Sequence, residues 1–68
     1  MNLKDKVYKL IVEFDSHYPG KVPGTGFLAG MCKTSKEAIR LQLIELHKEG
    51  KIQRIRTDVN FTDYRLVK

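Results

Sequence analysis

Residues 34 to 56 read Thr-Ser-Lys-Glu-Ala-Ile-Arg-Leu-Gln-Leu-Ile-Glu-Leu-His-Lys-Glu-Gly-Lys-Ile-Gln-Arg-Ile-Arg, and this stretch decides the fold. Ser35 is a favourable N-cap because its hydroxyl can accept from the free amides of the following turn, and Glu37 adds negative charge where the helix dipole favours it. The inward stripe of the helix consists of Ile39, Leu43 and Leu46. Gly50 can adopt the left-handed conformation that ends a helix. The stretch therefore predicts a capped helix over residues 36–49, followed by a basic strand.

Two more helices are predicted before this stretch. Apolar residues at helical spacing indicate an amphipathic helix over residues 3–17, which Pro19-Gly20 ends. Thr25 is the expected cap of a short second helix, residues 25–32. Between these helices, residues 21–23 suit a strand stub at the edge of a sheet, where proline is tolerated.

The C-terminal part of the chain predicts a β-hairpin over residues 51–67. Its strand candidates are 52–56 and 64–67, and the segment between them contains Asp and Asn residues that favour turns. The element order is helix, stub, helix, helix, hairpin. We therefore expect an α+β fold forming a single domain over residues 1–68.

Composition and charge limit the classes of function. Sixty-eight residues support one small core, and a net charge of +5 with a pI near 9.6 favours a polyanionic partner. The excess positive charge lies in residues 19–36 and 51–68, each of which sums to +3. The chain has no secretory signal and no apolar run long enough to span a membrane, so we expect a soluble, cytoplasmic protein without a membrane partner.

The residues that most often carry chemistry do not form a catalytic or metal-binding pattern. His17 and His47 have no acid or cysteine at ligand spacing, and the glycines lack the Gly-Lys-Ser/Thr ending of a phosphate-binding loop. The single Cys32 excludes an intramolecular disulfide; it is either a small buried residue or a redox sensor acting through an intermolecular disulfide. We expect no enzymatic activity, catalytic residue, metal, cofactor or small-molecule substrate.

A family resemblance rests on the second helix, the turn and the third helix. The residues that carry it are Phe27-Leu28-x-x-Met31, the turn Lys33-Thr34-Ser35, then Ile39, Leu43, Leu46, Gly50 and Ile52. This pattern resembles the winged helix-turn-helix DNA-binding domains of bacterial, archaeal and phage regulators, and its spacing is similar to that of the N-terminal domain of the LexA repressor. The resemblance implies three helices with a short strand stub and a C-terminal hairpin wing. It also implies a homodimeric, sequence-specific regulator of transcription that reads two half-sites of double-stranded DNA about one helical turn apart.

The resemblance assigns DNA contacts to the turn, the third helix and the wing. The expected contact residues are Lys21, Lys33, Thr34, Ser35, Lys36, Glu37, Arg40, Leu41, Lys51, Arg54, Arg56 and Asn60. Arg40 is the best base-reading candidate, because a guanidinium can bind two acceptors of guanine. Arg54 and Arg56 share a strand face by alternation. The other interpretations are that the hairpin charges form a solvated surface and that Glu37 only strengthens the helix start.

Three residues depart from the family pattern. Leu41 and Ile44 project away from the inward stripe, where family members usually carry polar or basic residues. Leu41 can contact a thymine methyl and Ile44 can pack beneath the wing, or both can belong to a protein interface. The alternative function is therefore a winged-helix protein-interaction module, such as an adaptor in a larger assembly. Cys32 stands where a glycine often opens the turn.

Overall fold

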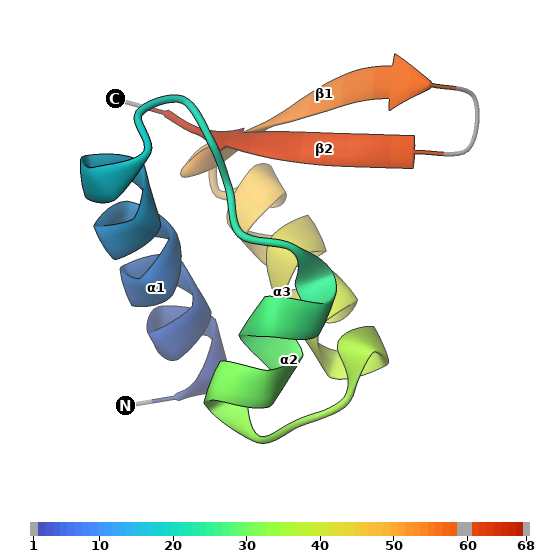
Figure 1. The fold of residues 1–68 in the computed structure, drawn as a ribbon. Helices are drawn as coiled ribbons and strands as arrows, with labels where there is room; N and C mark the ends of the chain where they lie inside the picture. The colour runs from blue at the N-terminus through green and yellow to red at the C-terminus, as the bar shows by residue number, and fades with distance from the viewer. Residues whose placement is uncertain (1, 59–60, 68) are drawn as a thin grey trace.

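The computed structural model describes the backbone of residues 2–58 and 61–67 and the side chains of residues 2–55 and 64–67. In chain order the elements are α1 (Leu3–His17), α2 (Thr25–Cys32), α3 (Lys36–Lys48), β1 (Ile52–Asp58) and β2 (Phe61–Leu66). Figure 1 shows the three helices packed together and the hairpin lying across the end where α1 and α3 finish. The prediction of an α+β fold with three helices and a C-terminal hairpin is confirmed.

Hydrogen bonds at both ends of α1 explain its length. The Asn2 side chain accepts from the Asp5 amide at 2.8 Å and caps the N-terminus. At the other end, Asp15 is only 6% exposed and its Oδ1 accepts from the Gly20 amide at 3.0 Å. Gly20 has a φ of +80°, which glycine adopts without steric cost. The helix therefore ends at His17, two residues before Pro19, as predicted.

The predicted cap of α2 is wrong. Thr25 is the first residue of the helix, and the N-cap is Gly24, which has no side chain to offer. The Leu28 amide donates to the Gly24 carbonyl at 3.0 Å, so the first turn closes through the backbone alone. At the far end, Lys33 adopts the left-handed conformation with φ 53° and ψ 49°.

The strand stub expected at residues 21–23 does not form in the described chain, whose only sheet contains β1 and β2. The Lys21 amide donates to the Tyr18 carbonyl at 3.1 Å, so it is engaged in the turn after α1. Pro23 has no amide hydrogen to give a neighbouring strand, and it is buried. Val22 packs against the core, so this segment is fixed by side-chain burial rather than by sheet pairing.

The ends and the inward stripe of α3 confirm the expectations for this helix. The Ser35 hydroxyl oxygen accepts from the Ala38 amide at 3.2 Å, and Gly50 has a φ of +77°. The helix ends at Lys48, one residue before the predicted end. The buried apolar residues of the core are Val7, Ile11, Leu28, Ala29, Ile39, Leu43, Leu46 and Ile52. None of the helices in the described chain is long and apolar enough to cross a membrane.

The hairpin strands are longer than expected and pair antiparallel. Ile52 pairs with Leu66 and Arg54 with Tyr64, and the register shifts between Arg56 and Asp58. Because directly paired residues project to the same face, Ile52, Leu66 and Tyr64 form the face that packs against the helices. Arg54 belongs to this same face, farther along the hairpin.

Candidate nucleic-acid interface

The turn between α2 and α3 presents three of the predicted contact residues. Lys33 and Ser35 are exposed and Thr34 is half-buried. The Thr34 amide donates to the Ala29 carbonyl at 3.0 Å, and the Ser35 oxygen is engaged with Ala38. The Ser35 hydroxyl proton remains able to donate outward, for example to a phosphate oxygen. The left-handed backbone at Lys33 ends α2 and directs the chain into the turn before α3.

The outward side of α3 carries a mixed set of side chains. Glu37 and Arg40 are exposed, and the exposed fractions of Leu41 and Ile44 are 61% and 43%. Leu41 lies one turn after Glu37, so an acid and an apolar residue share the part of the helix farthest from the core. Arg40 lies toward one edge of this surface. Lys48 lies seven residues after Leu41 and is exposed too, so the outward side combines apolar, acidic and basic side chains.

Arg40, Ile44 and His47 form a stripe along one edge of this surface. These residues are four and three positions apart, which places them on one side of a helix. The His47 ring lies edge-on to the Tyr64 ring of β2, with centroids 6.4 Å apart. His47 Nδ1 is also 3.3 Å from the Ile52 carbonyl oxygen. Two contacts from one histidine therefore fix the hairpin against this side of α3.

The contact between His47 and Tyr64 decides where Arg54 lies. Arg54 is paired with Tyr64 across the hairpin, so its exposed side chain projects from the sheet face that points toward α3. The structure thus brings Arg40 and Arg54 to one side of the molecule, although they belong to different elements. A helix with a basic edge beside a basic hairpin can bind a polyanion over both surfaces.

Lys36 extends along α2 rather than directly outward. Its Cε lies 3.5 Å, and its Nζ 3.9 Å, from the position that a Cβ on Gly26 would occupy. Because glycine has no side chain, the lysine stem can lie against the first turn of α2. The Lys36 ammonium therefore lies close to the first turn of α2, although the residue belongs to the first turn of α3.

Lys51 belongs to a different cluster at the base of the hairpin. Its Nζ lies 3.5 Å from Glu49 Oε1 and 5.1 Å from the centre of the Tyr8 ring. Lys4 Nζ lies 2.5 Å from Glu49 Oε2. The hydrogen bond from Lys4 holds the pKa of Glu49 below its usual value, and the same bond raises the pKa of Lys4. Lys51 thus shares the single negative charge of Glu49 with Lys4 and is held at the base of the hairpin.

Of the remaining predicted contacts, Lys21 lies away from this surface. Lys21 is exposed in the segment between α1 and α2, which passes near the base of the hairpin in Figure 1. This base is distant from the turn that opens α3. The Arg56 side chain and Asn60 lie outside the described part of the chain. The described surface therefore consists of the turn, the Arg40 edge of α3 and the Arg54 face of the hairpin.

Sequence reasoning assigned no role to His47 and did not single out Tyr64. The signal for His47 was its spacing of seven residues from Arg40, which gives the same side of a helix. The signal for Tyr64 was weaker, because its partner on β1 depends on the hairpin register. Among the described residues, no group of three or more histidine, cysteine or acidic side chains is arranged to hold a metal ion.

A comparison with known protein-family models finds no match to this chain, and a comparison with curated protein sequences finds none either.

Proposed function

We propose that this protein is a winged helix-turn-helix module that binds double-stranded DNA in a sequence-specific way and regulates transcription in the cytoplasm. In this proposal α3 enters the major groove, the hairpin serves as the wing, and no chemical step is catalysed. The observation that carries it is the packing of His47 on Tyr64, which orients the Arg54 face of the hairpin toward the α3 side that bears Arg40.

The charge distribution supports a polyanionic partner at this surface. Lys33 and Lys36 flank the turn, and the free Ser35 hydroxyl proton lies between them in sequence. Phosphate contacts of this kind position a protein on the duplex, whereas base contacts give specificity. Arg40 is the base-reading residue in the proposal, since a bidentate contact to guanine contributes about 1 to 3 kcal/mol of discrimination.

Titration of a fluorescent duplex, selected from a random library, tests the proposal at two salt concentrations. We expect Arg40→Ala to lose preference for the selected sequence and Arg54→Ala to weaken binding about equally for all sequences. We also expect affinity to fall by about 0.9 log units per log unit of salt for each neutralised phosphate.

Arg65→Ala is the matched control for Arg54→Ala. Arg65 pairs with Gln53, next to the pair of Arg54 and Tyr64, so its exposed side chain projects from the other face of the same hairpin. The substitution Arg65→Ala removes the same charge as Arg54→Ala, at nearly the same position along the hairpin. Equal losses for the two variants would indicate a non-specific charge effect, and no binding of the native protein at low salt would refute the proposal.

The second candidate function is a protein-interaction module, and it rests on the exposure of Leu41 and Ile44. The exposed fractions of these two side chains are 61% and 43%. Exposed apolar residues that lie together often mark a site of contact with another protein. In this case Arg40→Ala and Arg54→Ala leave partner binding intact, whereas Leu41→Glu abolishes it. Loss of sequence preference in Arg40→Ala, together with weaker DNA binding in Arg54→Ala, decides for the first function.

A further inference from the structure

A second exposed apolar surface lies between α1 and α2, on the side of the molecule that faces away from α3. We call it the α1–α2 seam, and its residues are Leu10, Phe14, Tyr18, Phe27 and Met31. Tyr18, Phe27 and Met31 are each more than half exposed, at 56%, 53% and 57%. An exposed cluster of large apolar side chains on a small protein usually marks a contact site.

The aromatic rings form one end of the seam. The Phe14 ring centroid is 4.9 Å from that of Tyr18 and 6.3 Å from that of Phe27. The other end is an open hollow of about 330 Å³ between α1 and α2. The hollow is lined by Lys6, Lys9, Leu10, Glu13, Met31 and Cys32. The seam thus combines a group of aromatic rings with a neighbouring hollow that is lined by two sulfur-containing side chains.

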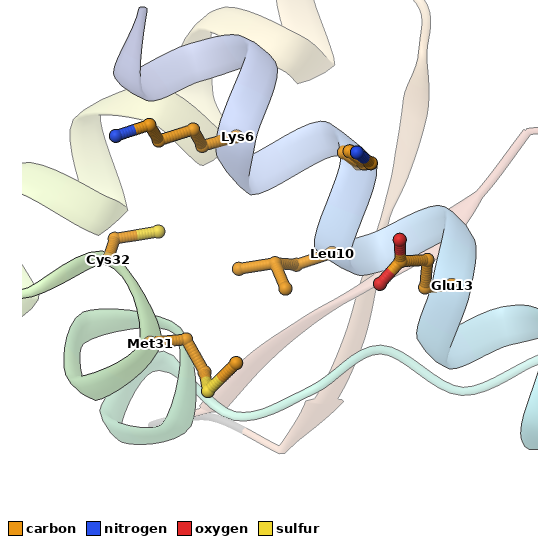
Figure 2. A pocket seen from close by; sticks show the side chains of 6 residues that line it. Lys6, Leu10, Glu13, Met31 and Cys32 are labelled. Carbon is orange, nitrogen blue, oxygen red and sulfur yellow. The ribbon is translucent and has the colours of Figure 1, made fainter. Parts of the chain in front are cut away.

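Three charged side chains of α1 line the hollow: the lysines Lys6 and Lys9, and the acid Glu13. Figure 2 shows Lys6 and Glu13 at opposite ends of the α1 wall, with Leu10 between them and Met31 and Cys32 across from it. Lys6 and Glu13 are seven residues apart, which is about two helical turns, so both project from the same side of α1. Both side chains are exposed. A partner for this surface needs an apolar centre, an acid opposite Lys6 and Lys9, and a base opposite Glu13.

We propose that the occupant of the α1–α2 seam is a second copy of this chain, related by a two-fold axis that passes near Leu10. In a two-fold contact each surface meets itself, so the α1 helices cross in antiparallel directions. Lys6 and Glu13 lie at nearly equal distances before and after Leu10. The axis therefore places Lys6 of each copy opposite Glu13 of the other and generates two identical ion pairs.

Leu10 lies between Lys6 and Glu13 in the wall of the hollow, so the same axis brings the hollows of the two copies face to face. The exposed Met31 side chain of each copy is covered in this contact.

Sedimentation of the protein without DNA tests this dimer independently of the proposed function. We expect the native 7.9-kDa chain to reach twice its monomer mass with increasing concentration. Met31→Glu should abolish association, and it should fold because Met31 is exposed. Val12→Glu is the matched control, since Val12 is 39% exposed on another side of α1.

Charge reversal tests the antiparallel register. We expect Lys6→Glu alone and Glu13→Lys alone to weaken dimerisation roughly 10-fold or more, because each dimer has two pairs that change from attraction to repulsion. An equimolar mixture of the two variants should restore association, since every pair in the mixed dimer is again of opposite sign. A monomeric native protein, or a mixture that stays as weak as its components, would overturn the proposal. Dissociation by Val12→Glu in place of Met31→Glu would overturn it too.

Discussion

Residues at helix ends show where single side chains control the backbone. Ser35 and Gly50 are recognisable in the sequence because a hydroxyl cap and a left-handed glycine each satisfy groups that a helix end leaves free. Lys33 is different, because nothing in its side chain favours the left-handed conformation that it adopts. The backbone closes the end of α2 there: the Lys33 amide donates to the Gly30 carbonyl at 3.3 Å and the Thr34 amide to the Ala29 carbonyl at 3.0 Å.

Replacement of Lys33 by glycine should therefore stabilise the protein. The left-handed region costs a residue with a Cβ about 1 to 2 kcal/mol, and part of this gain is offset by the greater freedom of glycine in the unfolded chain. We expect a net gain of about 0.5 to 1 kcal/mol in the free energy of unfolding for Lys33→Gly, measured as a higher urea midpoint at unchanged slope. Lys33→Ala removes the same charge but keeps the strain. Equal midpoints for the two variants would contradict the explanation.

Secondary-structure elements differ in how far the sequence predicts them. The helices were predictable because each has a periodic apolar face, and the bounds of α1 and α2 match the prediction. The absence of the expected stub at 21–23 was not predictable, because burial of Val22 and Pro23 fixes this segment without a partner strand. The position of Arg54 relative to Arg40 was not predictable either. It depends on the hairpin register that places Tyr64 opposite Arg54 and on the contact between the Tyr64 and His47 rings.

Helix α1 is tied to the end of α3 and the start of β1 by one group of charges. Glu49 follows α3 and is bonded to Lys4 of α1 and paired with Lys51, which also lies over Tyr8. The Val67 amide donates to the Lys51 carbonyl at 3.1 Å, so the same residue holds the last part of the hairpin. This cluster keeps the base of the hairpin at a fixed place relative to the three helices.

The pKa of Glu49 reports on this tie. The hydrogen bond from Lys4 is the largest cause that lowers it, so Lys4→Met should raise the pKa of Glu49 toward its usual value. Because the folded pKa is the lower one, the stabilisation is present at neutral pH and is lost as the pH falls through the folded pKa. The Lys4 and Glu49 side chains are 31% and 35% exposed, so the effect on stability is small. An NMR titration of the Glu49 carboxyl measures the shift directly.

Lys9→Met serves as the control for that titration. Lys9 is an exposed lysine of the same helix and lines the hollow beside α2, away from Glu49. It should leave the pKa of Glu49 unchanged. Equal shifts in the two variants would show that the pKa responds to net charge and not to the hydrogen bond.

At the scale of the whole molecule, the proposed DNA surface and the α1–α2 seam lie on opposite sides. The inward stripe of α3 packs against both other helices, so Leu41 on its outward side faces away from them. On α2, Gly26 lies beside Lys36 of α3, whereas Phe27 and Met31 turn toward α1. Figure 1 agrees, with α2 in front of α3. Binding at one surface therefore leaves the other accessible.

This arrangement predicts how a seam dimer would hold DNA. The two copies meet through the seam, and α3 is on the side of each copy away from it, so the two α3 helices face outward on opposite sides of the dimer. Such a dimer would hold two separate duplex segments and not two adjacent half-sites of one duplex. The prediction requires both the proposed DNA binding and the proposed dimer, and the sedimentation and titration experiments test each of them alone.

Capture of a fluorescent duplex by an immobilised duplex of the same sequence measures this bridging. We expect the native protein and Val12→Glu to retain the fluorescent duplex on the surface. Met31→Glu should still bind a single duplex in solution, because Met31 lies away from α3, but should lose roughly 10-fold or more of the captured signal as the dimer dissociates. Arg40→Ala should lose capture through weaker DNA binding while it still dimerises. Undiminished capture by a monomeric Met31→Glu protein would contradict bridging through the seam, as would native dimers that bind only paired half-sites on one duplex.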